Sequence, residues 1–147
     1  MATPPVDPIR RDVLAQTAKG ALALAASPAF AAGGATSPEA RWYQAALSMK
    51  RLAETWGDQP YGAVLVANGE LVGEGPSRVV KNQDPDAHAE REAIRDAQRR
   101  LGRKSLAGSV LYSTSRPCRL CEAAAAQAQV ARMVFGPDFV DAGAPKP

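Results

Sequence analysis

The chain is poor in the residues that bind soft metals. Its 147 residues include one histidine, His88, and two cysteines, Cys118 and Cys121. A closed structural site built from four Cys and His ligands is therefore excluded, and such a site would need a carboxylate as its fourth ligand. With so few candidates, the arrangement of these residues along the chain matters more than their number.

Basic runs and long apolar runs are also missing. The formal net charge is only +3, and the densest basic stretch, residues 95–104, has the spacing of a solvated helix face. The chain thus lacks the electrostatic footprint of a protein that follows a phosphate backbone, and nucleic acid is not an expected partner. No stretch approaches 18 consecutive apolar residues, so we expect no membrane span.

Residues 1–31 differ in composition from the rest of the chain. Arg10 and Arg11 precede a weakly apolar, alanine-rich stretch that ends in Ala-Phe-Ala at 29–31. This order is typical of a twin-arginine export signal with its cleavage site, and the alternative is an ordinary amphipathic helix. We predict an export signal over 1–31 and a linker over 32–37, hence a periplasmic or secreted protein, with a cytoplasmic location as the alternative.

The remaining residues are enough for one domain with an ordinary core. Ser37-Pro38 is typical of a helix N-terminus, and apolar residues at helical spacing continue until Gly57. Two β-rich runs then flank Asn68-Gly69, the residue pair that most favours a two-residue hairpin turn.

The second half of the chain alternates between helices and strands. A helix is predicted from near Asp86 to Gly102, a strand over 109–115, a helix over 117–131 and a last strand over 132–136. Helices that alternate with strands after an antiparallel hairpin indicate an α/β fold in which helices cover a mixed sheet.

The candidate metal ligands share a place in these predicted elements. His88, Cys118 and Cys121 each fall in the first turn of a helix, where backbone N–H groups and the positive end of the helix dipole favour thiolates. Together they give a Cys₂His set that leaves the fourth position of a zinc site open for water, as in catalytic sites. Zinc lowers the pKa of such a water from about 15.7 to about 7. Glu90, two residues after His88, is then the candidate for carrying protons.

Other interpretations stay open on these residues alone. In an exported protein, Cys118 and Cys121 are also compatible with a disulfide or with the C-x-x-C pair of a thiol-disulfide oxidoreductase. That interpretation leaves His88 and Glu90 without a role. A zinc-binding module without catalytic activity is a further alternative, and the presence of Glu90 argues against it.

Two short motifs carry a family resemblance. HAE at 88–90 and PCRLC at 117–121 follow the pattern H-x-E…P-C-x-x-C, which is typical of zinc-dependent nucleobase and nucleoside deaminases. Over about residues 38–136 the chain resembles this family, in particular the branch with guanine deaminase, bacterial cytosine deaminases and tRNA adenosine deaminase.

The resemblance implies a fold, an assembly and a set of roles. The fold is a three-layer α/β/α sandwich with a central mixed sheet, as in cytidine deaminase-like proteins, and the assembly is a homodimer or larger. His88, Cys118 and Cys121 would hold zinc, and Glu90 would be the general acid and base. The backbone N–H of Ala89 would contact the substrate.

Two departures from the family pattern concern the substrate. Relatives often have Asn in a G-x-N-R context where this chain has GPSR, so Ser77 stands at the base-contacting position. A hydroxyl has one donor and a shorter reach than a carboxamide. The chain also extends only eleven residues beyond Gly136, which leaves little to close over a substrate.

These observations predict a zinc-dependent deaminase domain over 38–147. Its reaction would be the hydrolytic deamination of a free nucleobase, a nucleoside or a related aminated heterocycle, and the family likeness favours guanine or another purine, then cytosine. The alternatives are an exported C-x-x-C thiol-disulfide oxidoreductase and an editor of the tRNA adenosine deaminase type. The editor needs a phosphate-binding surface that the charge pattern does not indicate.

Overall fold

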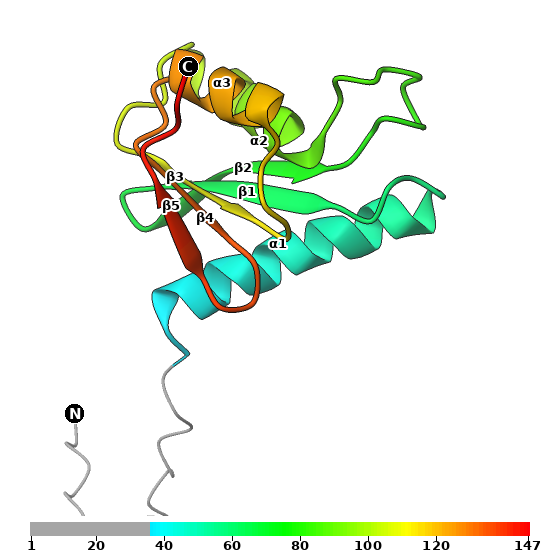
Figure 1. Cartoon of the computed structure of the whole chain (residues 1–147), viewed down its shortest axis with the longest axis horizontal. Coiled ribbons are helices and arrows are strands. Elements are labelled where there is room, and N and C mark those ends of the chain that lie inside the picture. Colours follow the sequence, from blue (N-terminus) through cyan, green and yellow to red (C-terminus); the bar gives the residue numbers. More distant parts are fainter. Residues whose placement is uncertain (1–35) are drawn as a thin grey trace, which may run out of the picture. The chain divides into compact units, whose positions relative to one another are not determined.

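The computed structural model describes residues 36–147 (Figure 1). The predicted export signal over 1–31 and most of the predicted linker lie outside the described residues. No helix within 36–147 is long and apolar enough to cross a membrane. In chain order the elements are α1 (Pro38–Thr55), β1 (Gly62–Ala67), β2 (Glu70–Pro76), α2 (Ala89–Leu101), β3 (Val110–Ser113), α3 (Arg119–Gln127), β4 (Arg132–Phe135) and β5 (Val140–Gly143).

The strands of this part of the chain form one mixed sheet in the order β2-β1-β3-β4-β5. Strand β1 pairs antiparallel with β2 and β3, whereas β3 and β4 are parallel because α3 crosses over between them. Helix α1 covers one face of the sheet, and α2 and α3 cover the other (Figure 1). This arrangement confirms the predicted three-layer α/β/α sandwich with a central mixed sheet.

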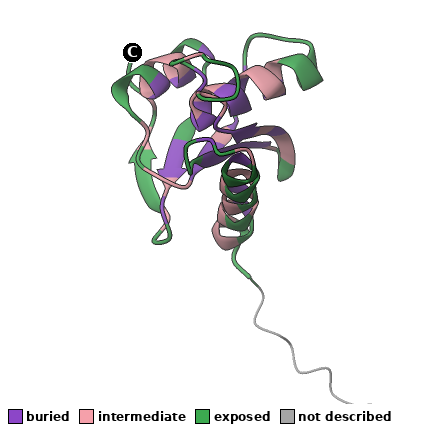
Figure 2. Cartoon of the chain, turned by 90° about the vertical axis from the view of Figure 1, so that its right-hand side faces the viewer, coloured by how far each residue is buried: buried purple, intermediate pink, exposed green. Residues whose placement is uncertain are grey.

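Strand β1 is buried on both sides because helices cover both faces of the sheet. Ala63 and Leu65 belong to the core between the sheet and the layer of α2 and α3. Val64 and Val66 belong to the core between the sheet and α1. Figure 2 shows the buried strands at the centre and the exposed and half-buried outer side of α1. The apolar run GAVLVA therefore has no polar alternation.

Local signals predict the first helix and the hairpin correctly. Ser37 is the N-cap of α1, and its hydroxyl accepts a hydrogen bond from the N–H of Ala40 at 3.2 Å. Asn68 and Gly69 have φ values of 51° and 73°, as a type I′ hairpin turn requires. Strand β5 is absent from the sequence prediction, because its residues are mostly exposed and give no apolar alternation.

Helices α2 and α3 begin later than the sequence predicts. The N–H of Asp86 donates to Oδ1 of Asp84, so a turn occupies the residues expected to open α2. As a result, His88 and Cys118 are the N-caps of α2 and α3, both in extended conformations. The prediction that the candidate ligands all lie in first turns is therefore wrong for these two, and correct for Cys121.

Helix α2 lies very close to β2, and glycine makes this possible. A Cβ atom at Gly75 would overlap the carbonyl oxygen of Ala89, and one at Gly73 would overlap the carbonyl oxygen of Ala93. Only a residue without a side chain allows such an approach. Because Ala89 is the first residue of α2, Gly75 sets the position of the helix N-terminus that carries Glu90.

We expect Gly75→Ala to destabilise the fold by about 1–3 kcal/mol, since the added methyl forces α2 away from the sheet. Urea unfolding followed by circular dichroism measures this change. Gly69→Asn is the control, because Gly69 has open space around it and asparagine tolerates its positive φ. A Gly75→Ala protein that unfolds at the same urea concentration as the unaltered chain would contradict the close packing.

Candidate metal centre and active site

Three side chains from two helix N-termini converge at one point. The Nδ1 atom of His88 lies 3.7 Å from Sγ of Cys118 and 3.4 Å from Sγ of Cys121. The three donor atoms all lie within 4.8 Å of one another. The structure therefore brings together the three residues that the sequence analysis selects as metal ligands.

The donor set fits zinc. Tetrahedral zinc with bonds of about 2.0 Å to nitrogen and about 2.3 Å to sulfur places a nitrogen and a sulfur ligand about 3.5 Å apart. The two distances from His88 Nδ1 to the sulfur atoms bracket this value. Both cysteines are free thiols, and Cys121 is buried. The geometry is that of a metal site and not of a disulfide.

The thiol of Cys121 is buried, and without a cation beside it the protonated form is favoured. Burial raises its pKa, and the negative charge of the neighbouring Glu90 carboxylate raises that pKa further. A divalent cation reverses this balance, because a coordinating thiol loses its proton. The N–H of Cys121 also donates to Sγ of Cys118 at 3.4 Å, so the first turn of α3 helps to fix the position of that sulfur.

The loop that carries His88 is fastened at its start by Asp58. The carboxylate of Asp58 accepts hydrogen bonds from the Ser77 hydroxyl at 2.9 Å and from the Lys81 N–H at 2.8 Å. The ammonium of Lys81 and the guanidinium of Arg78 lie 3.9 Å and 4.8 Å from the centre of the Trp56 ring, which is cation–π distance. These contacts fix the chain where it leaves β2.

Ion pairs also fasten the same loop to α2. The buried carboxylate of Glu92 pairs with Arg95 at 2.6 Å and with Arg78 at 3.5 Å. Arg95 also reaches Asp84 in the loop at 3.6 Å. Because Glu92 is buried, these pairs are screened less than surface pairs and hold the loop against α2. His88 thus lies on a loop that is held at its start and again at Asp84.

A cavity of about 390 Å³ opens beside the metal ligands. Three separate segments line it: Gln59 and Tyr61 before β1, the residues His88, Ala89 and Glu90 at the start of α2, and Ser115, Arg116 and Cys118 between β3 and α3. We refer to it as the active-site cavity. It contains the predicted proton carrier and the predicted backbone donor together with two of the ligands.

Ser77 is not among the residues that line the active-site cavity. Its side chain is fully buried, and its hydroxyl donates to Asp58. The structure therefore does not bring Ser77 together with the other predicted site residues. The physical reason is that the short Ser77 side chain makes its hydrogen bond to the nearest carboxylate, that of Asp58. The sequence pattern predicts only the position of Ser77 and not its hydrogen-bond partner.

Four cavity residues are missing from the sequence prediction. Ser115 and Arg116 directly precede the cysteine motif, and that adjacency is a signal that could have found them. Gln59 and Tyr61 carry no such signal. They reach the cavity because β1 pairs with β3, an alignment reinforced by the Gly62 N–H donating to the Thr114 hydroxyl at 3.1 Å.

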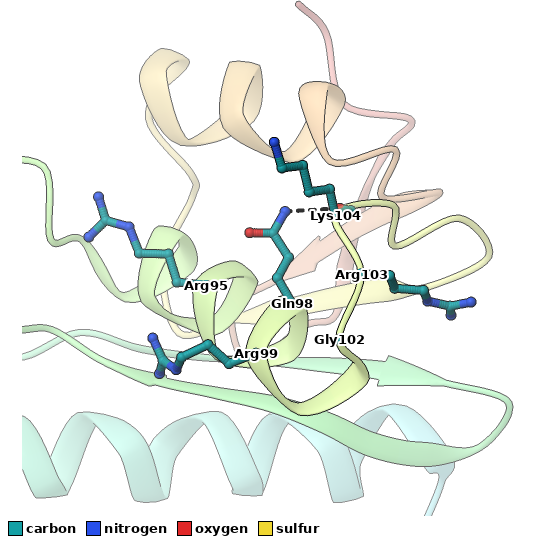
Figure 3. Close-up of a pocket in the computed structure, with 6 residues that line it drawn as sticks. All are labelled: Arg95, Gln98, Arg99, Gly102, Arg103 and Lys104. Carbon is teal, nitrogen blue, oxygen red and sulfur yellow. Dashed lines mark hydrogen bonds between the residues drawn. The ribbon is translucent and has the colours of Figure 1, made fainter.

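A second hollow, of about 550 Å³, lies at the C-terminal end of α2 (Figure 3). Its lining is Arg95, Gln98, Arg99, Gly102, Arg103 and Lys104. Arg95 and Arg99 are already paired with carboxylates, and the Gln98 side chain donates to the carbonyl of Lys104 at 2.9 Å. This lining has no thiol, imidazole or carboxylate, so it offers no side chain of the kinds that bind zinc.

The acid beside the metal ligands is held in one orientation. Glu90 is only 5% exposed, and Oγ of Ser113 donates to its Oε1 at 2.8 Å. A buried carboxylate next to an open Cys₂His set, at the wall of a cavity, is the arrangement of a metal-dependent hydrolytic site. The fold and the site together define this class of protein.

Residues 36–137 match the family described as the cytidine and deoxycytidylate deaminase zinc-binding region, and the chain belongs to this family. Among residues 36–147, His88, Cys118 and Cys121 form a cluster that could hold the zinc ion of this family. Similar proteins include the tRNA-specific adenosine deaminase of Buchnera aphidicola subsp. Schizaphis graminum, 36% identical over 68% of this chain and 66% of that protein. The guanine deaminase of Bacillus subtilis is 37% identical over 56% of this chain and 53% of that protein.

Solved structures agree with this assignment. A structure from a study of A-to-I editing by tRNA:A34 deaminases matches with a TM-score of 0.63 and 36% identity over 65% of this chain and 70% of that one. Guanine deaminase from Bacillus subtilis matches with a TM-score of 0.61 and 34% identity over 65% of this chain and 61% of that one. The chain spans less than two thirds of the length of the curated relatives named above.

We expect the unaltered protein to hold one zinc ion per chain, and His88→Ala, Cys118→Ser and Cys121→Ser each to lose most of it, because each removes one of three protein ligands. Metal analysis after extensive dialysis measures the content. Ser115→Ala is the control, since Ser115 lies on the same loop without contributing a ligand. A zinc-free chain whose two thiols oxidise reversibly would instead support the oxidoreductase alternative.

Asp58 should make the stability pH-dependent. Burial acts to raise its pKa, but the hydrogen bonds from Lys81, Gln59 and Ser77 outweigh it and hold the pKa below the ordinary value of 3.8. A lowered pKa in the folded state stabilises the fold above that value, and the contribution is lost as the pH falls through the folded pKa.

We therefore expect the unfolding free energy of the unaltered chain to exceed that of Asp58→Asn at neutral pH, and the difference to shrink from about pH 5 to about pH 3. Urea unfolding at a series of pH values measures it. Asp138→Asn, at an exposed turn, is the control. A difference that stays constant over this range would show that the charge of Asp58 is not what holds the loop.

Proposed function

We propose that this chain catalyses the hydrolytic deamination of an aminated heterocycle, namely a free nucleobase, a nucleoside or a related compound. The observation that carries the proposal is the position of Glu90. Its carboxylate is buried, oriented by Ser113 and part of the same cavity wall as His88 and Cys118. A site with zinc ligands alone would not need a buried acid at that point.

The reaction adds water to the ring carbon that bears the amino group and releases ammonia. Zinc, when bound by the Cys₂His set, supplies the charge that makes water nucleophilic at neutral pH. Glu90 takes one proton from the attacking water and gives it to the adjacent ring nitrogen. It then transfers the second proton to the departing amine, so that the C–N bond breaks and a ring carbonyl remains. Positioned proton transfer of this kind contributes about 10²–10⁴-fold in rate.

The active-site cavity suits a planar heterocycle. Its volume of about 390 Å³ falls in the range of about 300–1,000 Å³ typical of small-molecule sites. The ring of Tyr61 lines it and is 43% exposed, so it offers a face for stacking. The N–H of Ala89, at the first position of α2, has no partner within the helix and offers a donor to a ring acceptor.

Adenosine in tRNA is the second candidate substrate, because several of the similar curated proteins act on it by name. Against it stand the small net charge of +3 and an active-site cavity whose lining includes one cation, Arg116. Binding to a phosphate backbone draws on several Lys and Arg contacts. We therefore rank a small substrate first.

We expect Glu90→Gln to lower ammonia release by about 10²–10⁴-fold while zinc binding is retained, because the amide cannot carry protons. The panel is guanine, cytosine, adenine, their nucleosides, an aminopterin and an anticodon stem-loop RNA. Glu92→Gln is the matched control: Glu92 is also buried and lies on the same helix, and loss of its pairs with Arg78 and Arg95 should lower stability while the folded, zinc-loaded protein keeps its turnover.

The outcomes separate the candidates. Turnover of a base or nucleoside supports the proposal, and turnover of the RNA alone supports the editor. Zinc-loaded protein that acts on no member of the panel, or Glu90→Gln with full activity, would refute the mechanism.

A further inference from the structure

The two buried carboxylates of α2 have different partners. Glu92 is paired with the guanidinium groups of Arg78 and Arg95. Glu90 takes part in none of the ion pairs found within residues 36–147, and the hydroxyl of Ser113 donates to it at 2.8 Å. The acid that would carry protons is thus held by a neutral donor, which directs it without adding a charge.

Ser113 has a rigid place in the fold. It is the last residue of β3, its side chain is fully buried, and its backbone is paired with Ala63 of β1 and Phe135 of β4. A residue held between two neighbouring strands cannot follow the movement of a side chain on a helix. Its hydroxyl is therefore a fixed point against which the longer Glu90 side chain is oriented.

The direction of the hydrogen bond follows from the donors present. Oγ of Ser113 accepts from the N–H of Ser115 at 3.4 Å, so its single proton is available for Oε1 of Glu90. Ser115 lines the active-site cavity. The Ser113 hydroxyl, at the end of β3, is therefore hydrogen-bonded both to Glu90 and to Ser115 in the cavity wall.

We propose that Ser113 is a positioning residue for Glu90, a role that rests on the function proposed above. The hydrogen bond occupies Oε1 and selects one side-chain rotamer, which leaves Oε2 as the oxygen that exchanges protons with the substrate. Without this bond the carboxylate samples other rotamers, and a smaller fraction of molecules has the acid in its productive position. Ser113 itself touches neither the substrate nor the metal.

The chain contains a matched control for this role. Ser109, just before the start of β3, is also buried, and its hydroxyl donates to the carbonyl of Leu106 at 2.6 Å. Ser109→Ala also removes a buried hydroxyl and its hydrogen bond, here to a neutral carbonyl, without affecting Glu90. The two alanine variants separate a general loss of stability from a loss of positioning.

We expect Ser113→Ala to lower kcat about 10- to 100-fold, the loss of one hydrogen bond to a charged group, with little change in KM or zinc content. Ser113→Thr, which keeps the hydroxyl, should restore most of the activity, and Ser109→Ala should leave kcat near that of the unaltered chain. In the Glu90→Gln background, Ser113→Ala should add no further loss, because the two residues act as a unit.

Equal losses in Ser113→Ala and Ser109→Ala would overturn the proposal. So would a Ser113→Thr protein no more active than Ser113→Ala, or a further tenfold loss in the Glu90→Gln background. If Ser113→Ala does not fold, Ser113→Cys replaces it, since a thiol is a weak donor of similar size.

A spectroscopic measurement tests the same contact without any substrate. In protein labelled with ¹³C at the glutamate carboxyl carbon, the Glu90 resonance is assigned by its absence in Glu90→Gln. We expect this resonance to shift in Ser113→Ala and to stay in place in Ser109→Ala. An unshifted resonance in Ser113→Ala would refute the positioning role. If the resonance shifts but no member of the panel is turned over, the proposed function fails while the contact stands.

Discussion

The contact between α2 and β2 is the constraint on which the site depends. Gly73 and Gly75 let the helix approach until the backbone of Ala89 touches the strand. This approach fixes the height of the helix N-terminus above the sheet, and with it the places of His88 and Glu90. A side chain on either glycine would move the acid and one metal ligand together, whereas both cysteines belong to another helix.

The N-termini of α2 and α3 meet at the candidate metal centre. The positive potential at these helix ends and the burial of Cys121 have opposite effects on a thiolate there. The positive end of a helix favours a nearby negative charge, but burial and the charge of Glu90 raise the pKa of Cys121. A zinc ion held by His88, Cys118 and Cys121 would offset this effect, since its positive charge would stabilise thiolates beside the carboxylate. The charge of Glu90 and the protonation of the candidate ligand Cys121 are therefore coupled.

Substrate choice depends on segments that the zinc motif does not contain. Tyr61 and Gln59 enter the active-site cavity from the loop before β1, and Arg116 enters from the loop before α3. Ser77, which the family pattern marks for base contact, instead holds Asp58 and helps to anchor the loop that carries His88. These outlying segments set the shape and charge of the active-site cavity.

The amino-acid sequence alone determined most of the elements, the fold class and the candidate reacting groups. The Ser37 cap and the Asn68-Gly69 turn depend on interactions between residues close along the chain. The motifs that contain His88, Glu90 and the two cysteines are visible in the sequence itself. Strand β5, the partner of Ser77 and the approach of Tyr61 and Ser113 to the site were decided only by tertiary structure. These features depend on which strands pair and which faces pack, so they arise from contacts between residues far apart in sequence, and no local pattern encodes them.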